Sequence, residues 1–133
     1  AEAETDFSAT VNSTALHFRT ATSGAATTKL QITSDGRGLS QFTAKAWTQM
    51  DMSNMSINDS HNVGSVTDIS AGRARINFTN AMGNSSYAIA TTQAESYSSG
   101  HSNLTTGNFS LYTYDMNGTK VDTDKVMAIV FGD

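Results

Sequence analysis

The sequence predicts an all-β protein, and three observations support this prediction. Val, Ile, Thr, Tyr and Phe recur in short alternating runs, which suit strands buried on one side. Ser, Thr, Asn and Gly are in excess and fit the turns between such strands. No segment keeps a 3.6-residue apolar period over the length of a helix. We therefore expect about six to eight strands in a small antiparallel β-sandwich of jelly-roll-like organisation.

The composition argues against several other classes of protein. The 133 residues suffice for one ordinary domain, or for a small domain with an extension. Without cysteine there is no disulfide framework, no cysteine metal site and no thiol nucleophile. The net charge is −4 and the eight Lys and Arg residues are scattered singly, so we do not expect nucleic acid binding. No apolar run approaches the roughly 20 residues of a membrane-spanning helix, so we expect no membrane insertion.

The first forty residues predict a β-hairpin with little core. Residues 15–20 and 29–33 alternate apolar and polar side chains, and a turn at residues 34–37 ends the second strand. One face of the hairpin carries its few large apolar side chains, which are Leu16, Phe18, Leu30 and Ile32. A two-stranded ribbon of this kind is marginally stable alone in water. The hairpin therefore needs a neighbour, and we expect residues 1–40 to form an extension and residues 41–133 to form a globular head. Because the chain begins without Met, we expect a processed product or a fragment of a longer protein.

The head begins with a loosely alternating strand at residues 41–50. One face of this strand carries Phe42, Ala44, Ala46 and Thr48, and Trp47 lies on the other. Residues 51–62 are polar and contain methionine, and we interpret them as a loop with at most one irregular strand.

The clearest hairpin of the sequence follows this loop. It consists of a strand at residues 63–69, a turn at 70–72 and a strand at 73–79. Its apolar positions are Val63, Val66, Ile69, Ala74, Ile76 and Phe78. A further strand at residues 86–92 contains Tyr87 and Ile89.

Residues 93–106 show no sustained alternation, and we expect them to form the longest loop of the second half. Residues 108–114 predict a strand with Phe109, Leu111 and Thr113 on one face and Tyr112 and Tyr114 on the other. An Asn-Gly turn follows at residues 115–119.

The last strand, at residues 125–131, is apolar on both faces. Val126, Ala128 and Val130 alternate with Met127, Ile129 and Phe131. Such a strand must be covered on both sides, so we expect it at the centre of a sandwich or at a subunit contact. Three identical copies around one axis would cover both this strand and the thin hairpin. The expected contacts of this homotrimer are Leu16, Phe18, Leu30, Ile32, Met127, Ile129 and Phe131.

Motifs for catalysis or metal binding are weak or absent. His17, His61 and His101 are far apart and form no metal-binding spacing, so we expect no metal site and no cofactor. Asp122 and Asp124 resemble a fragment of a calcium loop, but the further carboxylate and the glycine of such a loop are missing, so we interpret them as a turn with two solvated carboxylates. A polysaccharide depolymerase needs two carboxylates across a cleft. Candidates for that pair are Asp51, Asp59, Asp68, Glu95 and Asp115, but none has the apolar context that would raise its pKa. We therefore expect no enzymatic activity.

Several segments resemble a C-terminal module of tail-fibre and other structural proteins of marine bacteriophages. These segments are SINDSHNVGSVTD (56–68), RINFTNAM (75–82) and KVMAIVFG (125–132). In addition, LHFRT (16–20) and TKLQITSDG (28–36) are similar to the hairpin that precedes such modules in fibre shafts. The resemblance covers nearly the whole chain from about residue 6, and it contains no catalytic signature. It implies a trimeric fibre segment of the virion, in which a shaft hairpin leads into a β-head.

Host attachment is the function that this resemblance implies, with other tail or capsid proteins as further partners. Sugar-binding surfaces combine aromatic faces with amide and hydroxyl groups, and exposed loops carry such surfaces. The candidate receptor-binding residues, for a host surface polysaccharide, are Gln93, Glu95, Tyr97, His101, Asn103, Tyr114 and Asn117. A purely structural or decoration module without receptor binding remains an alternative, and a depolymerase remains another.

Overall fold

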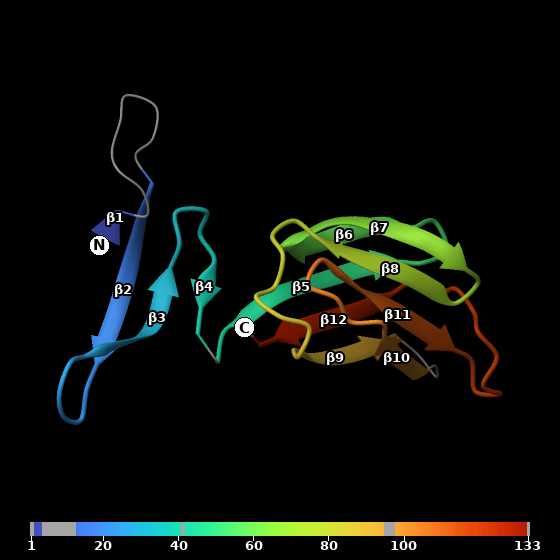
Figure 1. The fold of residues 1–133 in the computed structure, drawn as a ribbon. Coiled ribbons are helices and arrows are strands. Elements are labelled where there is room, and N and C mark those ends of the chain that lie inside the picture. Colours follow the sequence, from blue (N-terminus) through green and yellow to red (C-terminus); the bar gives the residue numbers. More distant parts are fainter. Residues whose placement is uncertain (1, 4–12, 41, 95–97, 133) are drawn as a thin grey trace. The chain divides into compact units, whose positions relative to one another are not determined.

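The protein is all-β in the computed structural model, which describes residues 2–3, 13–40, 42–94 and 98–132 (Figure 1). Every strand pairing among these residues is antiparallel. The chain divides into two compact units, Ala1–Thr43 (unit 1) and Ala44–Asp133 (unit 2). In the part of the chain that the structure describes, no helix is long and apolar enough to cross a membrane.

Unit 1 is a four-stranded sheet with its strands in sequence order. The strands are β1 (Glu2–Ala3), β2 (Thr14–Thr20), β3 (Thr27–Ile32) and β4 (Gly38–Leu39). In the β2–β3 hairpin Leu16 pairs with Ile32, and Phe18 pairs with Leu30. Cross-strand partners point to the same side of a sheet. These four apolar side chains therefore share one face, as the sequence predicted.

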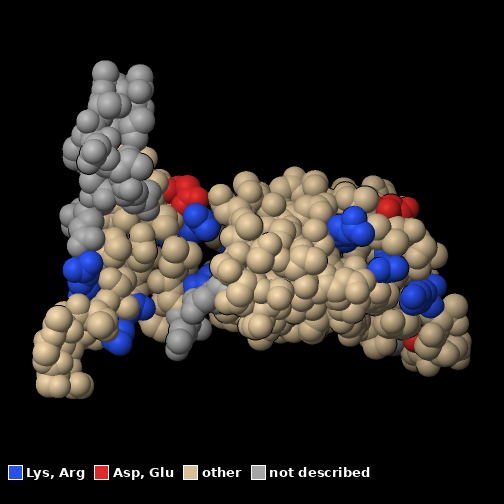
Figure 2. All heavy atoms as spheres, viewed as in Figure 1, with Lys and Arg blue, Asp and Glu red and all other residues tan. Residues whose placement is uncertain are grey.

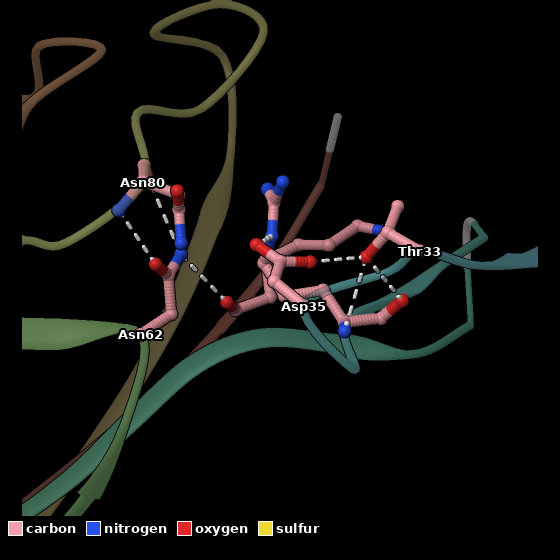
Figure 3. A network of polar contacts seen from close by, with 6 residues as sticks. Thr33, Asp35, Asn62 and Asn80 are labelled. Carbon is pink, nitrogen blue, oxygen red and sulfur yellow. Dashed lines mark hydrogen bonds and ion pairs between the residues drawn. The ribbon is translucent and has the colours of Figure 1, made fainter. Parts of the chain in front are cut away.

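A polar turn connects β3 to β4. Asp35 accepts a hydrogen bond from the Thr33 hydroxyl and pairs with the Arg37 guanidinium at 2.8 Å (Figure 3). These contacts hold the pKa of Asp35 below its ordinary value, with the Thr33 hydrogen bond as the largest cause. Gly36 has a φ of +81°, which suits glycine in a tight turn. The turn thus fixes the direction in which β4 returns along β3.

Unit 2 consists of two four-stranded sheets. Its strands are β5 (Ala44–Asp51), β6 (Ser56–His61), β7 (Val63–Ser70), β8 (Arg73–Phe78), β9 (Ala88–Gln93), β10 (Ser98–Ser102), β11 (Asn108–Tyr114) and β12 (Val126–Phe131). One sheet has the order β6-β5-β12-β9, and we call it the Trp47 sheet. The other has the order β10-β11-β8-β7, and we call it the Tyr112 sheet. The two sheets pack face to face as a β-sandwich-like unit (Figure 1).

The core of unit 2 lies between the sheets. The Trp47 sheet contributes Ala46, Met50, Val126, Ala128 and Val130, and the Tyr112 sheet contributes Ala74, Ile76, Phe109 and Leu111. Met52, Met82 and Tyr87 join this core from the connections. The last strand, β12, is a central strand with its even-numbered residues in the core. β12 therefore lies at the centre of its sheet as predicted, but only one of its two apolar faces is covered by the sandwich.

Asn62 fixes the point where the chain passes from one sheet to the other, between β6 and β7. Its side-chain amide donates to the carbonyls of Lys45 and Asn80, both at 3.1 Å (Figure 3). Its Oδ1 accepts the backbone N–H of Asn80 at 2.8 Å. Its φ of +55° is a left-handed conformation that Asn adopts more readily than most residues. One side chain therefore ties three segments together.

One strand lies where the sequence predicted a loop, and another is the single irregular strand that the prediction for residues 51–62 allowed. β6 forms most of the segment 51–62, and β10 lies inside the segment 93–106. Both are edge strands of their sheets. Many of their side chains are exposed, so they carry few apolar residues and give no alternating signal.

Three apolar residues lie elsewhere than predicted. Phe42 is 71% exposed and precedes β5, which begins at Ala44. Ile69 is 36% exposed because the register shifts between Asp68 and Ser70 and moves it out of the core pattern. Tyr87 precedes β9, yet its ring lies in the core edge-to-face with Phe78 at 5.8 Å.

Candidate functional site

The outer face of the Tyr112 sheet collects aromatic and cationic side chains. Along β11 the buried residues Phe109, Leu111 and Thr113 face the core, so Tyr112 and Tyr114 face outward. Arg73 is the register partner of Tyr112 on β8. The opposite neighbour of Tyr112, on β10, is Gly100, which leaves open space above the sheet.

Tyr112 is the centre of this group. Its ring lies nearly parallel to that of Tyr114, with ring centroids 6.4 Å apart and an angle of 13° between the planes. The Arg73 guanidinium carbon lies 5.3 Å from the Tyr112 centroid, and the Lys120 ammonium nitrogen lies 4.9 Å from it. Both distances fall in the range of cation–π contacts. Two positive charges are thus held beside one aromatic surface.

Lys120 reaches Tyr112 from the turn that follows β11. The turn folds back so that Lys120 forms an isolated antiparallel bridge with Tyr114. Asp115 holds the turn by accepting the backbone N–H groups of Asn117 at 2.9 Å and Thr119 at 2.8 Å. The cation is therefore positioned by backbone pairing next to its aromatic partner.

The phenol of Tyr112 is polarised by its surroundings. Ser102 on β10 donates a hydrogen bond to the Tyr112 oxygen at 3.1 Å. This hydrogen bond is the largest cause that lowers the pKa of Tyr112, and the charges of Arg73 and Lys120 lower it further. The face is therefore electrostatically favourable to negative charge.

The cations of this face lack carboxylate partners. Arg73, Arg75 and Lys120 form no ion pair with any residue that the structure describes. In addition, Arg73 Nε is buried without a hydrogen-bond partner. The space-filling view shows the Lys and Arg atoms of unit 2 on a mostly uncharged surface (Figure 2). These unpaired cations lie on the surface of a protein of net charge −4, with Asp115 and Asp122 in the neighbouring turns.

The receptor-binding residues predicted from the sequence are distributed over several places. Tyr114 lies in the aromatic pair, and the side-chain amide of Asn103 contacts the Ser110 hydroxyl at 3.4 Å. His101 is exposed on β10, and Asn117 is exposed in the turn after β11. Gln93 ends β9, with its amide atoms buried and without partners among the described residues. Glu95 and Tyr97 lie outside the described residues.

Sequence reasoning missed the cationic half of this face. Arg73 and Arg75 are far from Tyr112 in the sequence, and Lys120 lies in a turn. The alternation of residues 73–79 does place both arginines on the polar face of their strand. The pairing of β8 with β11, which brings them beside the tyrosines, has no local signal in the sequence.

The outer face of the Trp47 sheet is different, because it is largely apolar. It has an open groove of about 390 Å³ across β5, β12 and β9. The outward residues that line it are Trp47, Gln49, Ala90, Thr92, Met127 and Ile129. Register places Trp47, Ile129 and Ala90 in one row across the sheet.

The trimer contacts predicted from the sequence lie on two surfaces. Met127, Ile129 and Phe131 are half-buried on the outer face of β12. On the hairpin of unit 1, Leu16 is 42% exposed, Phe18 50% and Ile32 40%, and Leu30 is partly buried. The described part of a single chain thus leaves both surfaces incompletely covered.

Two of the carboxylates weighed for catalysis or metal binding make structural contacts. Among the described residues, no group of three His, Cys, Asp or Glu side chains is placed to hold a metal ion. Asp122 accepts the backbone N–H of Gly72 at 2.7 Å, which is a structural contact. Asp51 accepts the backbone N–H of Ser53 at 2.8 Å and organises the turn between β5 and β6.

The comparisons with known proteins add no relative. No protein-family model, curated protein or solved structure matched this chain. The proposals below therefore rest on the residues, their geometry and the resemblance noted in the sequence.

Proposed function

We propose that this protein is a non-enzymatic attachment module of a bacteriophage tail fibre or related virion appendage. In this proposal the hairpin of unit 1 is shaft-like, unit 2 is a jelly-roll-like head, and three copies assemble as a homotrimer. The head would bind a host surface polysaccharide, and the module would contact other tail or capsid proteins of the virion. The sequence resemblance to marine phage proteins motivates the virion assignment.

The observation that carries this proposal is the partly exposed apolar face of the β2–β3 hairpin. Large apolar side chains gain roughly 1.5–3 kcal/mol each when they are fully buried. Leu16, Phe18 and Ile32 are each at least 40% exposed, so they obtain only part of this free energy of burial. Covering this face with the same face of further copies would recover it, and a closed ring of identical copies does so without leaving an open end.

The outer face of the Trp47 sheet supports the same proposal. Its row of Trp47, Ile129 and Ala90 is apolar, whereas the exposed faces of antiparallel sheets are usually polar. Aromatic residues and Met are enriched at protein interfaces. Contact with a second copy would complete the burial of Met127 and Phe131 as well.

Sedimentation equilibrium of the purified protein tests the assembly. We expect the mass of a trimer of the 14.1-kDa chain. Phe18→Asp should dissociate it, because a charge would be placed in the apolar contact. Thr67→Asp is the matched control, since Thr67 is exposed on β7, and it should leave the mass unchanged. A stable monomer for the unsubstituted protein would refute the trimer.

Attachment is tested with fluorescently labelled protein on a panel of bacteria and the phages that infect them. We expect the protein to stain susceptible cells and to reduce phage adsorption. A trimer that stains none of them would instead favour a structural or decoration module. Shortening of purified surface polysaccharide by the protein would contradict the non-enzymatic assignment.

A further inference from the structure

We infer that the outer face of the Tyr112 sheet binds an acidic saccharide, with its anionic group held by Arg73 and Lys120. This inference deepens the proposed attachment function and rests on it. It names the class of the ligand and places the site on the sheet rather than in the loop at residues 93–106.

Three cationic side chains belong to this face. Arg73 and Arg75 lie on β8 and Lys120 lies in the turn after β11, and none has a carboxylate partner among the described residues. Surface cations in an acidic protein are usually offset by nearby acids, so this gathering favours an external anion. Arg73 is suited to such an anion because guanidinium groups bind carboxylates and sulfates through two parallel hydrogen bonds.

The second step is the geometry of Arg73. Its Nε is buried and has no partner in the structure described. This Nε lies out of reach of a ligand, but Arg73 as a whole is only partly buried. An anion would therefore contact the terminal N–H groups of the guanidinium, whose carbon lies 5.3 Å from the Tyr112 centroid.

The third step is the aromatic surface. Tyr112 and Tyr114 present nearly parallel rings, and the two cations contact the Tyr112 ring. The Tyr114 ring has no cation contact among the described residues, so it is available to the apolar C–H face of a sugar ring. Anion binding at Arg73 and stacking on Tyr114 can therefore occur in one ligand.

The fourth step is space and polarity around the rings. A Cβ added at Gly100, next to Tyr112, would meet no atom within 4 Å. A ligand can therefore lie beside Tyr112 without a clash. The Ser102 hydroxyl and the Asn103 amide lie close by, and such groups suit sugar hydroxyls.

Calorimetric titration of the intact protein with three polymers tests the inference. These polymers are polygalacturonate (carboxylate), dextran sulfate (sulfate) and neutral dextran. We expect binding of one or both acidic polymers and at least about tenfold weaker binding of neutral dextran, as charge-assisted hydrogen bonds are worth about 1.5–3 kcal/mol. The acidic polymer that binds with the higher affinity identifies the anionic group. Equal binding of all three, or binding of none, would overturn the inference.

Substitutions locate the site. Arg73→Gln and Lys120→Gln should each weaken binding of the acidic polymer about tenfold, since each removes one charged contact. Lys120 is exposed, so Lys120→Gln tests the site even if Arg73→Gln disturbs folding. Lys29→Gln removes the same charge from an exposed position of unit 1 and should leave affinity unchanged. If Lys29→Gln and Lys120→Gln lose the same affinity for the acidic polymer, the binding is a general charge attraction and the defined site is refuted.

A steric variant separates this site from simple charge effects. Gly100→Leu keeps every charge but fills the space beside Tyr112, so it should abolish binding of the acidic polymer. Single-stranded DNA is a control polyanion, and binding as tight as that of the acidic saccharide would also refute the inference. Cells that are stained equally by the unsubstituted protein and by Gly100→Leu would refute this site while leaving the attachment function standing. An absence of staining by both would refute the attachment function itself.

Discussion

Neighbouring residues of β11 have opposite environments. Thr113 is fully buried, and its hydroxyl donates to the Val121 carbonyl, whereas Tyr112 and Tyr114 on either side face outward. Successive side chains of a strand point to opposite faces of the sheet, so the neighbours of a core-facing residue face outward. The parity of a position on this part of β11 therefore decides whether its side chain faces the core or the outer surface of the sheet.

Gly72 provides a residue-scale prediction, because its position requires glycine for two reasons. Its φ is +64°, and an added Cβ would lie 2.5 Å from Val121 N and 2.7 Å from Thr113 O. Gly118 has a similar φ of +77° but nothing within 4 Å of an added Cβ. We expect Gly118→Ala to lower the free energy of unfolding by about 1 kcal/mol, for the left-handed backbone alone.

Gly72→Ala should cost about 3 kcal/mol or more, because backbone atoms must also move to remove the clash. Urea denaturation followed by circular dichroism measures both values. Equal losses for the two variants would show that the close approach at Gly72 is unimportant.

Among the elements, the strands with a strongly apolar face were predictable, and so were the edge strands β7 and β9. The polar edge strand β10 was not predicted, and β6 was expected only as an irregular strand within a loop. The strands that became β8, β11 and β12 alternate clearly in sequence, and each was predicted to within about two residues. β6 and β10 are polar edge strands whose formation depends on pairing with β5 and β11. Pairing between distant segments is a tertiary property, so sequence periodicity does not reveal it.

For the same reason only part of the candidate binding face was predictable. Tyr114 was identified as an outward aromatic residue, and Asn103 was identified by its polar loop. Arg73 and Lys120 are recognisable as partners of Tyr112 only after β8 and the turn at Lys120 are paired beside β11.

The crossover at Asn62 gives an element-scale prediction. Asn62→Ala removes three hydrogen bonds to backbone groups of Lys45 and Asn80 and disfavours the left-handed φ. We expect a loss of about 2–4 kcal/mol in the free energy of unfolding. Asn62→Gly keeps the φ and loses only the hydrogen bonds, so it should cost less. If Asn62→Ala is as stable as the unsubstituted protein, this side chain does not hold the crossover.

The turn between β5 and β6 gives a pH-dependent prediction. Hydrogen bonds from Ser53 and Asn54 lower the pKa of Asp51, with the Ser53 hydroxyl as the largest cause. A carboxylate with a lowered folded-state pKa stabilises the fold above its unfolded pKa of about 3.9 and loses this contribution as the pH falls through the folded pKa. When the pH is lowered below about 4, the free energy of unfolding should therefore fall less for Asp51→Asn than for the unsubstituted protein.

Unfolding midpoints measured from neutral to acidic pH test this expectation. Asp124→Asn is the control, because Asp124 is exposed and has no hydrogen bond to a described residue. The control should follow the unsubstituted protein. A pH profile of Asp51→Asn that also does so would contradict a role for the Asp51 carboxylate.

The whole molecule combines a compact sandwich with a thin sheet. Unit 2 has a buried core that includes Phe109, Met50 and Leu111, whereas unit 1 buries few apolar side chains. If assembly supplies the missing burial, stability must depend on protein concentration, because association binds the folded state. We expect the thermal midpoint in scanning calorimetry to rise as the concentration is increased about a hundredfold.

Phe18→Asp is the matched variant for this measurement. Its midpoint should be lower and independent of concentration, since it should no longer associate. A concentration-independent midpoint for the unsubstituted protein would contradict an assembly that dissociates on unfolding.

The boundary between Thr43 and Ala44 has an evolutionary consequence. Every described strand pairing lies within one unit, and no described ladder crosses this boundary. Recombination at this point would therefore exchange one unit for another without disrupting either sheet system. A lineage could acquire a new saccharide specificity by replacing unit 2 and retaining the segment encoding unit 1.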